Sequence, residues 1–238
     1  MKGQRAKRTD DAGRAFAGSQ HQLQLYVSRH REVLDSAILR AAGLRSGLEW
    51  VSPLQLDQFK EYKDAAFLRA LGLSHLTGQL RQFWPASGPR WDGLARTVGR
   101  DPVAVVLVEA KNYPREVRGG GCKASDVGGA RQQILAALES TAKELGVSDS
   151  KVWMGPLYQY ANRIAHAAFL RRNGVDAFMV NVCFYNDPHL ARRTTESEWR
   201  QAAIALKGEI GFTAGSPPWL SDVFLPAADG AEFLGAAI

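Results

Sequence analysis

Cysteine is rare in this sequence. The 238 residues contain two cysteines, Cys122 and Cys183, which lie far apart and form no C-x-x-C pair. This spacing excludes a disulfide scaffold and a zinc ribbon, and it is typical of a protein from the reducing cytoplasm. The five histidines show no metal-ligand spacing with one another or with the cysteines, so a zinc site is not expected either. We therefore expect a cytoplasmic protein.

Long apolar runs are also missing. No apolar stretch is long enough to span a membrane, so we expect no membrane partner. The N-terminus is basic, but no apolar stretch follows it, which excludes a secretory signal. We predict that residues 1–19 form a flexible basic tail. Residues 20–238 are predicted to form a single domain, because neither an internal repeat nor a domain linker is evident.

The overall composition is that of an ordinary globular protein. Apolar residues make up 45% of the chain and charged residues 23%. A chain of 238 residues is long enough for one α/β domain with its own hydrophobic core. The formal net charge of +6 favours a polyanion, such as nucleic acid, as the partner.

The strongest pattern is the stretch VAVVLVEAK, residues 103–111. Its first six residues are apolar and rich in valine, which predicts a central strand buried on both faces. Because side chains alternate along a strand, Glu109 and Lys111 are expected to point to the same side, with Ala110 opposite. This acid and amine are either an ion pair at the edge of the core or part of a functional site.

A second predicted strand, residues 91–98, carries Asp92 near its start. The short turn at residues 99–102 predicts that the two strands form an antiparallel hairpin. Such a hairpin would bring Asp92 and Glu109 together. Two carboxylates and the Ala110 carbonyl would then form a hard oxygen site for Mg²⁺. Lys111 would orient or deprotonate an attacking water beside that site.

This arrangement, Asp92 followed after sixteen residues by Glu109-Ala110-Lys111, resembles the PD-(D/E)XK nuclease superfamily with its restriction-endonuclease-like fold. The sequence departs from the family pattern at Trp91, where the family has proline. The resemblance covers about residues 56–186, and the stretches WDGLA, LVEAKN and YQYANRIAHAAFLRRNGVDAF look like an uncharacterised bacterial branch of the superfamily. It implies a nuclease that hydrolyses phosphodiester bonds, with DNA favoured over RNA. The implied cofactor is Mg²⁺, for which Mn²⁺ would substitute.

Residues 56–71 are predicted to form a helix that carries Glu61. The resembled superfamily often has a glutamate on the helix before the core strands, so Glu61 is a candidate third acid and would complete a second metal site. The alternative is a surface glutamate that pairs with Lys60, Lys63 or Arg69.

A glycine-rich loop follows the E-x-K strand at residues 112–123. Its basic residues are Arg115, Arg118 and Lys123. They either contact the phosphates of a nucleic acid or belong to a mobile surface loop. A Walker P-loop is excluded, because Cys122 and Ala124 flank the lysine where that motif needs glycine and serine or threonine. The spacing of Gly119, Gly121 and Ala124 imitates a dinucleotide fingerprint, but the loop separates it from the strand.

A helix predicted at residues 157–172 carries a polar stripe. Its members recur at the i, i+3, i+4 and i+7 spacing and are Gln159, Asn162, Arg163 and His166. The stripe is either the solvated face of the helix or the lining of a substrate cleft. In the second interpretation Gln159 and Arg163 contact nucleic acid.

The rest of the sequence predicts further helices and strands, which together indicate an α/β protein. Further helices are predicted at about residues 21–42, 125–145 and 196–210, and further strands at residues 80–84, 175–185 and 219–225, with residues 50–53 as a connector. We predict a central mixed β-sheet flanked by helices, with a restriction-endonuclease-like core. The alternative to a nuclease is a non-catalytic nucleic-acid-binding module, or a partner-dependent subunit, with the same fold.

Overall fold

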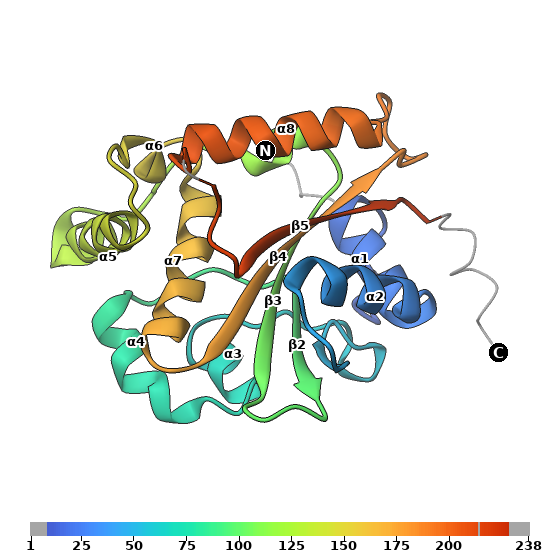
Figure 1. Ribbon diagram of the computed structural model, residues 1–238, viewed down its shortest axis with the longest axis horizontal. Helices are drawn as coiled ribbons and strands as arrows, with labels where there is room; N and C mark the ends of the chain where they lie inside the picture. Colours follow the sequence, from blue (N-terminus) through green and yellow to red (C-terminus); the bar gives the residue numbers. More distant parts are fainter. Residues whose placement is uncertain (1–8, 214, 229–238) are drawn as a thin grey trace, which may run out of the picture.

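The sheet is the centre of the molecule (Figure 1). The computed structural model describes residues 9–213 and 215–228, and these form one five-stranded sheet in the spatial order β1-β2-β3-β4-β5. The strands are β1 (Gly47–Ser52), β2 (Gly93–Val98), β3 (Ala104–Lys111), β4 (Asp176–Tyr185) and β5 (Leu220–Pro226). Strands β1 to β3 pair antiparallel, whereas β3 to β5 pair parallel. The predicted α/β class with a central mixed sheet is confirmed.

Helices cover both faces of this sheet. They are α1 (Gly18–Arg29), α2 (Arg31–Ala42), α3 (Asp64–Ala70), α4 (Thr77–Phe83), α5 (Ala130–Glu144), α6 (Lys151–Met154), α7 (Tyr158–Arg172) and α8 (Glu196–Ile210). Short 3₁₀ turns lie between them, namely η1 (Gln55–Asp57), η2 (Ser74–Leu76), η3 (Pro114–Val117) and η4 (Val127–Gly129). In the described parts of the chain, no helix has both the length and the apolar character needed to cross a bilayer.

The sheet separates two hydrophobic clusters. On one face Val106, Val108 and Val180 pack with apolar residues of α1 and α2. On the other face Leu107 and Met179 pack with apolar residues of α3, α4, α5 and α7. In Figure 1, α1 and α2 accordingly lie on the opposite side of the strands from α7, and α8 runs across the end of the molecule near β4 and β5. We call these the α1/α2 face and the α7 face.

The two strands predicted around the E-x-K motif are confirmed. Strand β2 pairs antiparallel with β3, with Gly93 opposite Val108, so the short turn does form a hairpin. Strand β4 then pairs parallel with β3 after a crossover through α5, α6 and α7. The last predicted helix agrees with α8, whose first turn is closed by a capping box between Thr195 and Glu198.

Several predicted elements are wrong. Residues 80–84, predicted as a strand, lie in or directly after helix α4, where Leu80 and Trp84 are buried with the four-residue spacing of a helical face. Residues 50–53, predicted as a connector, include the end of β1, in which Trp50 is buried. The helix predicted at residues 21–42 is interrupted at His30, whose φ of −124° is not helical, and so becomes α1 and α2.

Two more helices are shorter than predicted. Of residues 56–71 only α3 is α-helical, and the residues before it include an extended segment in which Tyr62 pairs with Trp91. The helix predicted from residue 125 begins at Ala130, because Gly128 and Gly129 adopt positive φ angles directly before it.

The domain boundaries also need correction. Residues 1–8 of the predicted basic tail lie outside the described residues. The rest of that tail is ordered: Thr9 pairs with Ala15, Ala15 is buried, and α1 begins at Gly18. The core extends beyond residues 56–186, because β1, β5 and α8 belong to the same sheet and its covering layer.

Candidate functional site

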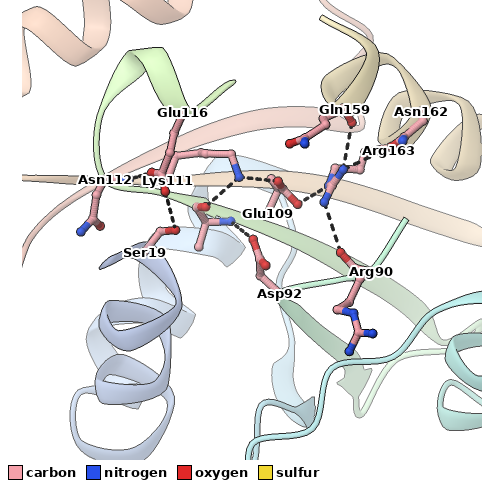
Figure 2. Close-up of polar contacts among 11 residues, drawn as sticks. Ser19, Arg90, Asp92, Glu109, Lys111, Asn112, Glu116, Gln159, Asn162 and Arg163 are labelled. Carbon is pink, nitrogen blue, oxygen red and sulfur yellow. Dashed lines mark hydrogen bonds and ion pairs between the residues drawn. The ribbon is translucent and has the colours of Figure 1, made fainter. Parts of the chain in front are cut away.

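The β2–β3 hairpin brings Asp92 to the end of β3. The Ala110 backbone N–H donates a hydrogen bond of 2.8 Å to Asp92 Oδ2. Asp92 lies directly before β2, next to Trp91, which belongs to the α7-face cluster. Figure 2 shows Asp92 and Glu109 side by side on this face, so the two predicted acids do come together.

Glu109 is buried between two cations. One carboxylate oxygen accepts from Lys111 Nζ at 2.5 Å, and the other accepts from Arg163 Nε. Lys111 Nζ also donates to the Ala110 carbonyl at 3.1 Å. Burial alone raises the pKa of Glu109, but the charges of Arg163 and Lys111 outweigh it and leave this pKa below its ordinary value. Glu109 is therefore an ionised carboxylate at neutral pH.

Lys111 is held in its charged form. Burial lowers the pKa of Lys111, but the negative charges of Glu109 and Asp92 more than offset this and raise it above its ordinary value. In this arrangement Lys111 is a hydrogen-bond donor and a positive charge. It is not a base that is ready to take a proton.

Asp92 has the opposite electrostatic character. Burial raises the pKa of Asp92 from 3.8 to about 7, and the charge of Glu109 adds to this effect. Its hydrogen bond from Ala110 and the cations Lys111 and Arg163 act in the other direction but do not cancel the shift. Burial thus makes the charged form of Asp92 unfavourable, and a cation bound next to its carboxylate would favour that form.

Glu61 approaches the same place by a different route from the one predicted. It lies in the extended segment next to Tyr62, whose carbonyl accepts from the Trp91 N–H at 3.0 Å, and not on a helix. Its side chain is 15% exposed and its ion-pair partner is Arg90, at 3.8 Å, in place of the expected surface lysines or Arg69. Burial raises the pKa of Glu61, and Glu109 contributes to the shift, so the two carboxylates sense each other.

The polar stripe of α7 is mostly buried, so its interpretation as a solvated face is wrong. Only Gln159 is exposed, whereas Asn162, Arg163 and His166 are at most 8% exposed. His166 Nδ1–H donates to the Asn162 carbonyl at 2.7 Å, and the His166 ring packs against the Trp84 ring. Burial lowers the pKa of His166 to about 4, so it is a neutral core residue.

Arg163 is fixed by the protein itself. Its guanidinium donates to Glu109, to the Gln159 carbonyl at 3.0 Å and to the Arg90 carbonyl at 3.2 Å (Figure 2). It also donates to Asn162 Oδ1 at 3.3 Å. Arg163, predicted to contact phosphate, is thus a partner of Glu109 in this structure.

The other predicted nucleic-acid contacts divide into two groups. Lys123 and Gln159 line a cleft of about 370 Å³ that also includes Arg163. Arg115 and Arg118 lie beside α8 on a separate part of the surface, and Arg118 forms an exposed ion pair with Glu209. Arg118 is therefore engaged by a carboxylate of the protein, and the structure does not bring it to the Glu109 site.

The oxygen atoms at this site are of the type that binds a hard divalent cation. Asp92, Glu109 and the Ala110 carbonyl offer oxygen atoms, and a carboxylate has about four lone-pair positions, of which the contacts described use only some. Mg²⁺ commonly takes one or two carboxylates and keeps several waters. Among the described residues, no group of three or more His, Cys, Asp or Glu side chains is arranged to hold a metal. Glu61 thus does not complete a second ligand set in this conformation.

Two residues that the sequence analysis missed extend the site across the sheet. Asn181 on β4 is the register partner of Glu109, and Asp222 on β5 is the register partner of Asn181. Asn181 Nδ2 donates to Asp222 Oδ1 at 2.8 Å, and Lys207 of α8 lies 2.7 Å from Asp222 Oδ2. An asparagine inside the apolar run of residues 175–185 was the only visible signal, and it did not identify a partner.

These polar side chains enclose a small cavity. It measures about 20 Å³ and is lined by Glu109, Lys111, Asn181 and Asp222, together with apolar residues of α8. The surface of the cavity is mainly apolar, because the polar side chains around it are engaged with one another. The row from Asp92 to Asp222 is therefore one continuous polar strip across four strands.

Comparison of the chain with family models, with curated proteins and with solved structures finds no match in any of the three.

Proposed function

We propose that this protein is a metal-dependent nuclease of the PD-(D/E)XK type, which hydrolyses phosphodiester bonds in nucleic acid. One observation carries the proposal: Asp92, Glu109 and Lys111 meet at the end of a buried strand, with Lys111 on both Glu109 and the Ala110 carbonyl. This is the set of groups that the E-x-K resemblance implies. Burying these charged groups at the rim of an otherwise apolar core costs hydration free energy, and a function would explain why the chain keeps them there.

Each residue of the site then has a role in the proposed reaction. Asp92, Glu109 and the Ala110 carbonyl would hold Mg²⁺, or Mn²⁺ in its place, and the bound ion would offset the negative charge that develops on the phosphoryl oxygens. Lys111, which is held protonated, would orient the attacking water and add a second positive charge next to the reacting phosphate. Arg163 keeps the Glu109 carboxylate in place through a hydrogen bond. Glu61 and Arg90 lie at the edge of the site as an ion pair.

Nucleic acid is the proposed substrate because of charge as well as resemblance. The net charge is +6, and the cleft beside Glu109 is lined by Arg90, Lys123 and Arg163, with no acidic residue in its lining within the described part of the chain. DNA is favoured over RNA by the resemblance alone. The restriction-endonuclease-like core is likewise proposed from the resemblance alone.

The test is a cleavage assay on single- and double-stranded DNA and RNA in Mg²⁺, Mn²⁺ or EDTA. We expect cleavage with either metal and none in EDTA. Glu109→Gln should reduce the rate by at least about a hundredfold, because it removes a charged ligand and disturbs Lys111 and Arg163. Glu139→Gln, an exposed glutamate on α5, is the matched control and should cleave at the wild-type rate. Cleavage that survives in EDTA, or equally in both variants, would refute the assignment.

A nucleic-acid-binding module without catalysis is the second candidate. It is favoured by the contacts that Lys111 and Arg163 already make with both oxygens of Glu109, since a protein needs no metal to stabilise a carboxylate held in this way. A module of this kind would bind nucleic acid equally well in EDTA, weaken with salt, and cut in no lane. A partner-dependent subunit would show neither binding nor cleavage until its partner is added.

A further inference from the structure

The cleft of about 370 Å³ adjoins the Glu109 site, because Arg163 is part of both. Its lining contains the basic residues Arg90, Lys123 and Arg163, the amides of Gln159 and Asn162, and one aromatic residue, Tyr158. Arg90 is exposed and its guanidinium points away from Arg163 (Figure 2). Among the described residues, none that lines the cleft is acidic, although Arg90 is paired with Glu61 and Arg163 with Glu109 beside it.

One wall of the cleft is held in place before any ligand enters. The glycine-rich loop is tied to the segment before α7 by hydrogen bonds from Gly119 N to the Pro156 carbonyl, 2.9 Å, and from Cys122 N to the Met154 carbonyl, 3.0 Å. Gly121 has a φ of +76°, and a Cβ atom at this position would lie 3.0 Å from the Met154 carbonyl oxygen. The loop is therefore held in a fixed conformation, and this conformation requires glycine at position 121.

Lys123 is the side chain that this wall offers to a ligand. It is exposed and forms no ion pair within residues 9–213 and 215–228. Its aliphatic part lies along Gly120, where a Cβ atom would come within 3.7 Å of Lys123 Cε. Arg163, in contrast, is already bound to Glu109, so Lys123 is the cation that remains available for a phosphate.

Tyr158 gives the cleft an aromatic surface. Its ring is half-buried and stacks on Trp84, with ring centroids 6.5 Å apart and an interplanar angle of 26°. Burial raises the pKa of the Tyr158 phenol well above its ordinary value, so the ring stays neutral at physiological pH. A neutral aromatic ring supported from behind is a stacking surface for a nucleobase, and a neighbouring cation for the phosphate completes the pattern of single-strand recognition.

The size of the cleft suits one nucleotide. Its volume of about 370 Å³ lies near the lower end of the range for small-molecule sites, roughly 300–1,000 Å³. The preference for a single strand follows from Tyr158, because a base can stack on its ring only when that base is unpaired. We propose that the cleft is a single-nucleotide subsite, in which Lys123 contacts a phosphate and Tyr158 stacks on an unpaired base, so that the substrate enters as a single strand. This assignment of substrate class rests on the nuclease function proposed above.

Binding in EDTA tests the subsite without requiring catalysis. Fluorescence anisotropy would measure the affinity of the wild type for a labelled 12-mer single strand of DNA and for the duplex of the same sequence. We expect the single strand to bind at least about fivefold more tightly. Lys123→Met and Tyr158→Leu should each weaken single-strand binding by about tenfold, because each removes one of the two contacts.

Matched variants separate recognition from folding. Tyr158→Phe keeps the ring and should bind within about twofold of the wild type. Lys143→Met on α5 and Tyr113→Leu at the start of η3 alter exposed residues away from the cleft and should leave binding unchanged. Thermal unfolding shows whether each variant is folded. If Tyr158→Leu does not fold, Lys123→Met decides the result alone.

Two results would overturn the subsite: a duplex that binds as tightly as the single strand, or Lys123→Met binding like the wild type. Its failure is distinct from that of the nuclease function. Metal-dependent cleavage of duplex DNA that requires Glu109, without single-strand preference, would leave the nuclease intact and remove the subsite. Single-strand binding that is weakened as expected in the variants, but without any cleavage, would leave the subsite intact and remove the nuclease function.

Discussion

The same strands present two very different faces. Toward α1 and α2, strand β3 offers Val106, Val108 and Ala110, which are all fully buried and apolar up to the end of the strand. Toward α7, the same strand offers apolar Val105 and Leu107 and then ends with Glu109 and Lys111. The change of character thus occurs on one face only and at one end only.

This difference shows which part of the sheet stabilises the fold. Apolar burial on the α1/α2 face contributes free energy in proportion to the area removed from water. A buried ion pair often contributes no more than apolar residues of the same size would, because both ions lose their hydration. The polar strip from Asp92 to Asp222 is therefore not needed to hold the sheet together, which supports a functional reason for its presence.

The largest effect is expected on the apolar face. Phe184 is fully buried and its ring centroid lies 5.3 Å from that of Tyr26. Phe184→Ala should lower the free energy of unfolding by about 3–5 kcal/mol, because it leaves a cavity that the packed neighbours cannot fill. Urea denaturation measures the change. A loss below about 1 kcal/mol would mean that this face does not carry the stability of the sheet.

On the α7 face, breaking one ion pair should cost somewhat less. Arg163→Met leaves the buried Glu109 carboxylate with Lys111 as its remaining cationic contact, so we expect a loss of about 3 kcal/mol in the free energy of unfolding. The double variant with Glu109→Gln should recover part of this loss, since it removes the uncompensated charge. Additive losses in the double variant, measured by the same denaturation, would show that the two side chains do not interact.

The pH dependence distinguishes the faces further through Asp92. Its folded-state pKa, about 7, lies above the ordinary value of 3.8, so the folded protein keeps a proton that the unfolded chain has lost. This contribution makes the wild type less stable as the pH rises from about 4 to about 7. Asp92→Asn should therefore be more stable than the wild type by about 2 kcal/mol at pH 8, with a smaller gain at pH 5.

Mg²⁺ sharpens this test. A cation bound next to Asp92 favours the ionised carboxylate, so added Mg²⁺ should raise the melting temperature of the wild type at pH 8 and have little effect on Asp92→Asn. Differential scanning calorimetry of both proteins in Mg²⁺-free and Mg²⁺-containing buffers measures these melting temperatures. In the pH test, if Asp92→Asn raised the free energy of unfolding by the same amount at every pH, ionisation of the buried Asp92 carboxylate would not destabilise the fold.

The smallest effect is expected at the far end of the polar strip. Asp222→Asn keeps an acceptor for Asn181 but loses the ion pair with Lys207, which is partly exposed. We expect a loss of about 1 kcal/mol in the free energy of unfolding. Lys207→Met should lose a similar amount, and the double variant little more. A change of several kcal/mol would place Asp222 among the structural residues of the sheet.

Local sequence patterns determined the elements whose stability is mainly local or whose burial is complete. The valine-rich run predicts β3 because a strand covered on both faces has no polar positions before its end. The short turn after β2 permits only an antiparallel neighbour, which put Asp92 next to Glu109. Helix α8, predicted at residues 196–210, is also fixed locally, because the structure shows a capping box between Thr195 and Glu198 at its start.

Tertiary structure alone decided the rest, because the relevant neighbours are far apart in the chain. Residues 80–84 alternate well enough for a strand, but packing selected a helix. Glu61 reaches Glu109 through pairing of Tyr62 with Trp91, and Arg163 reaches it from a helix 54 residues away. The row of Glu109, Asn181 and Asp222 depends on the register of three strands. Register is set by crossovers and by burial of whole faces, so no local pattern encodes which polar side chains will meet.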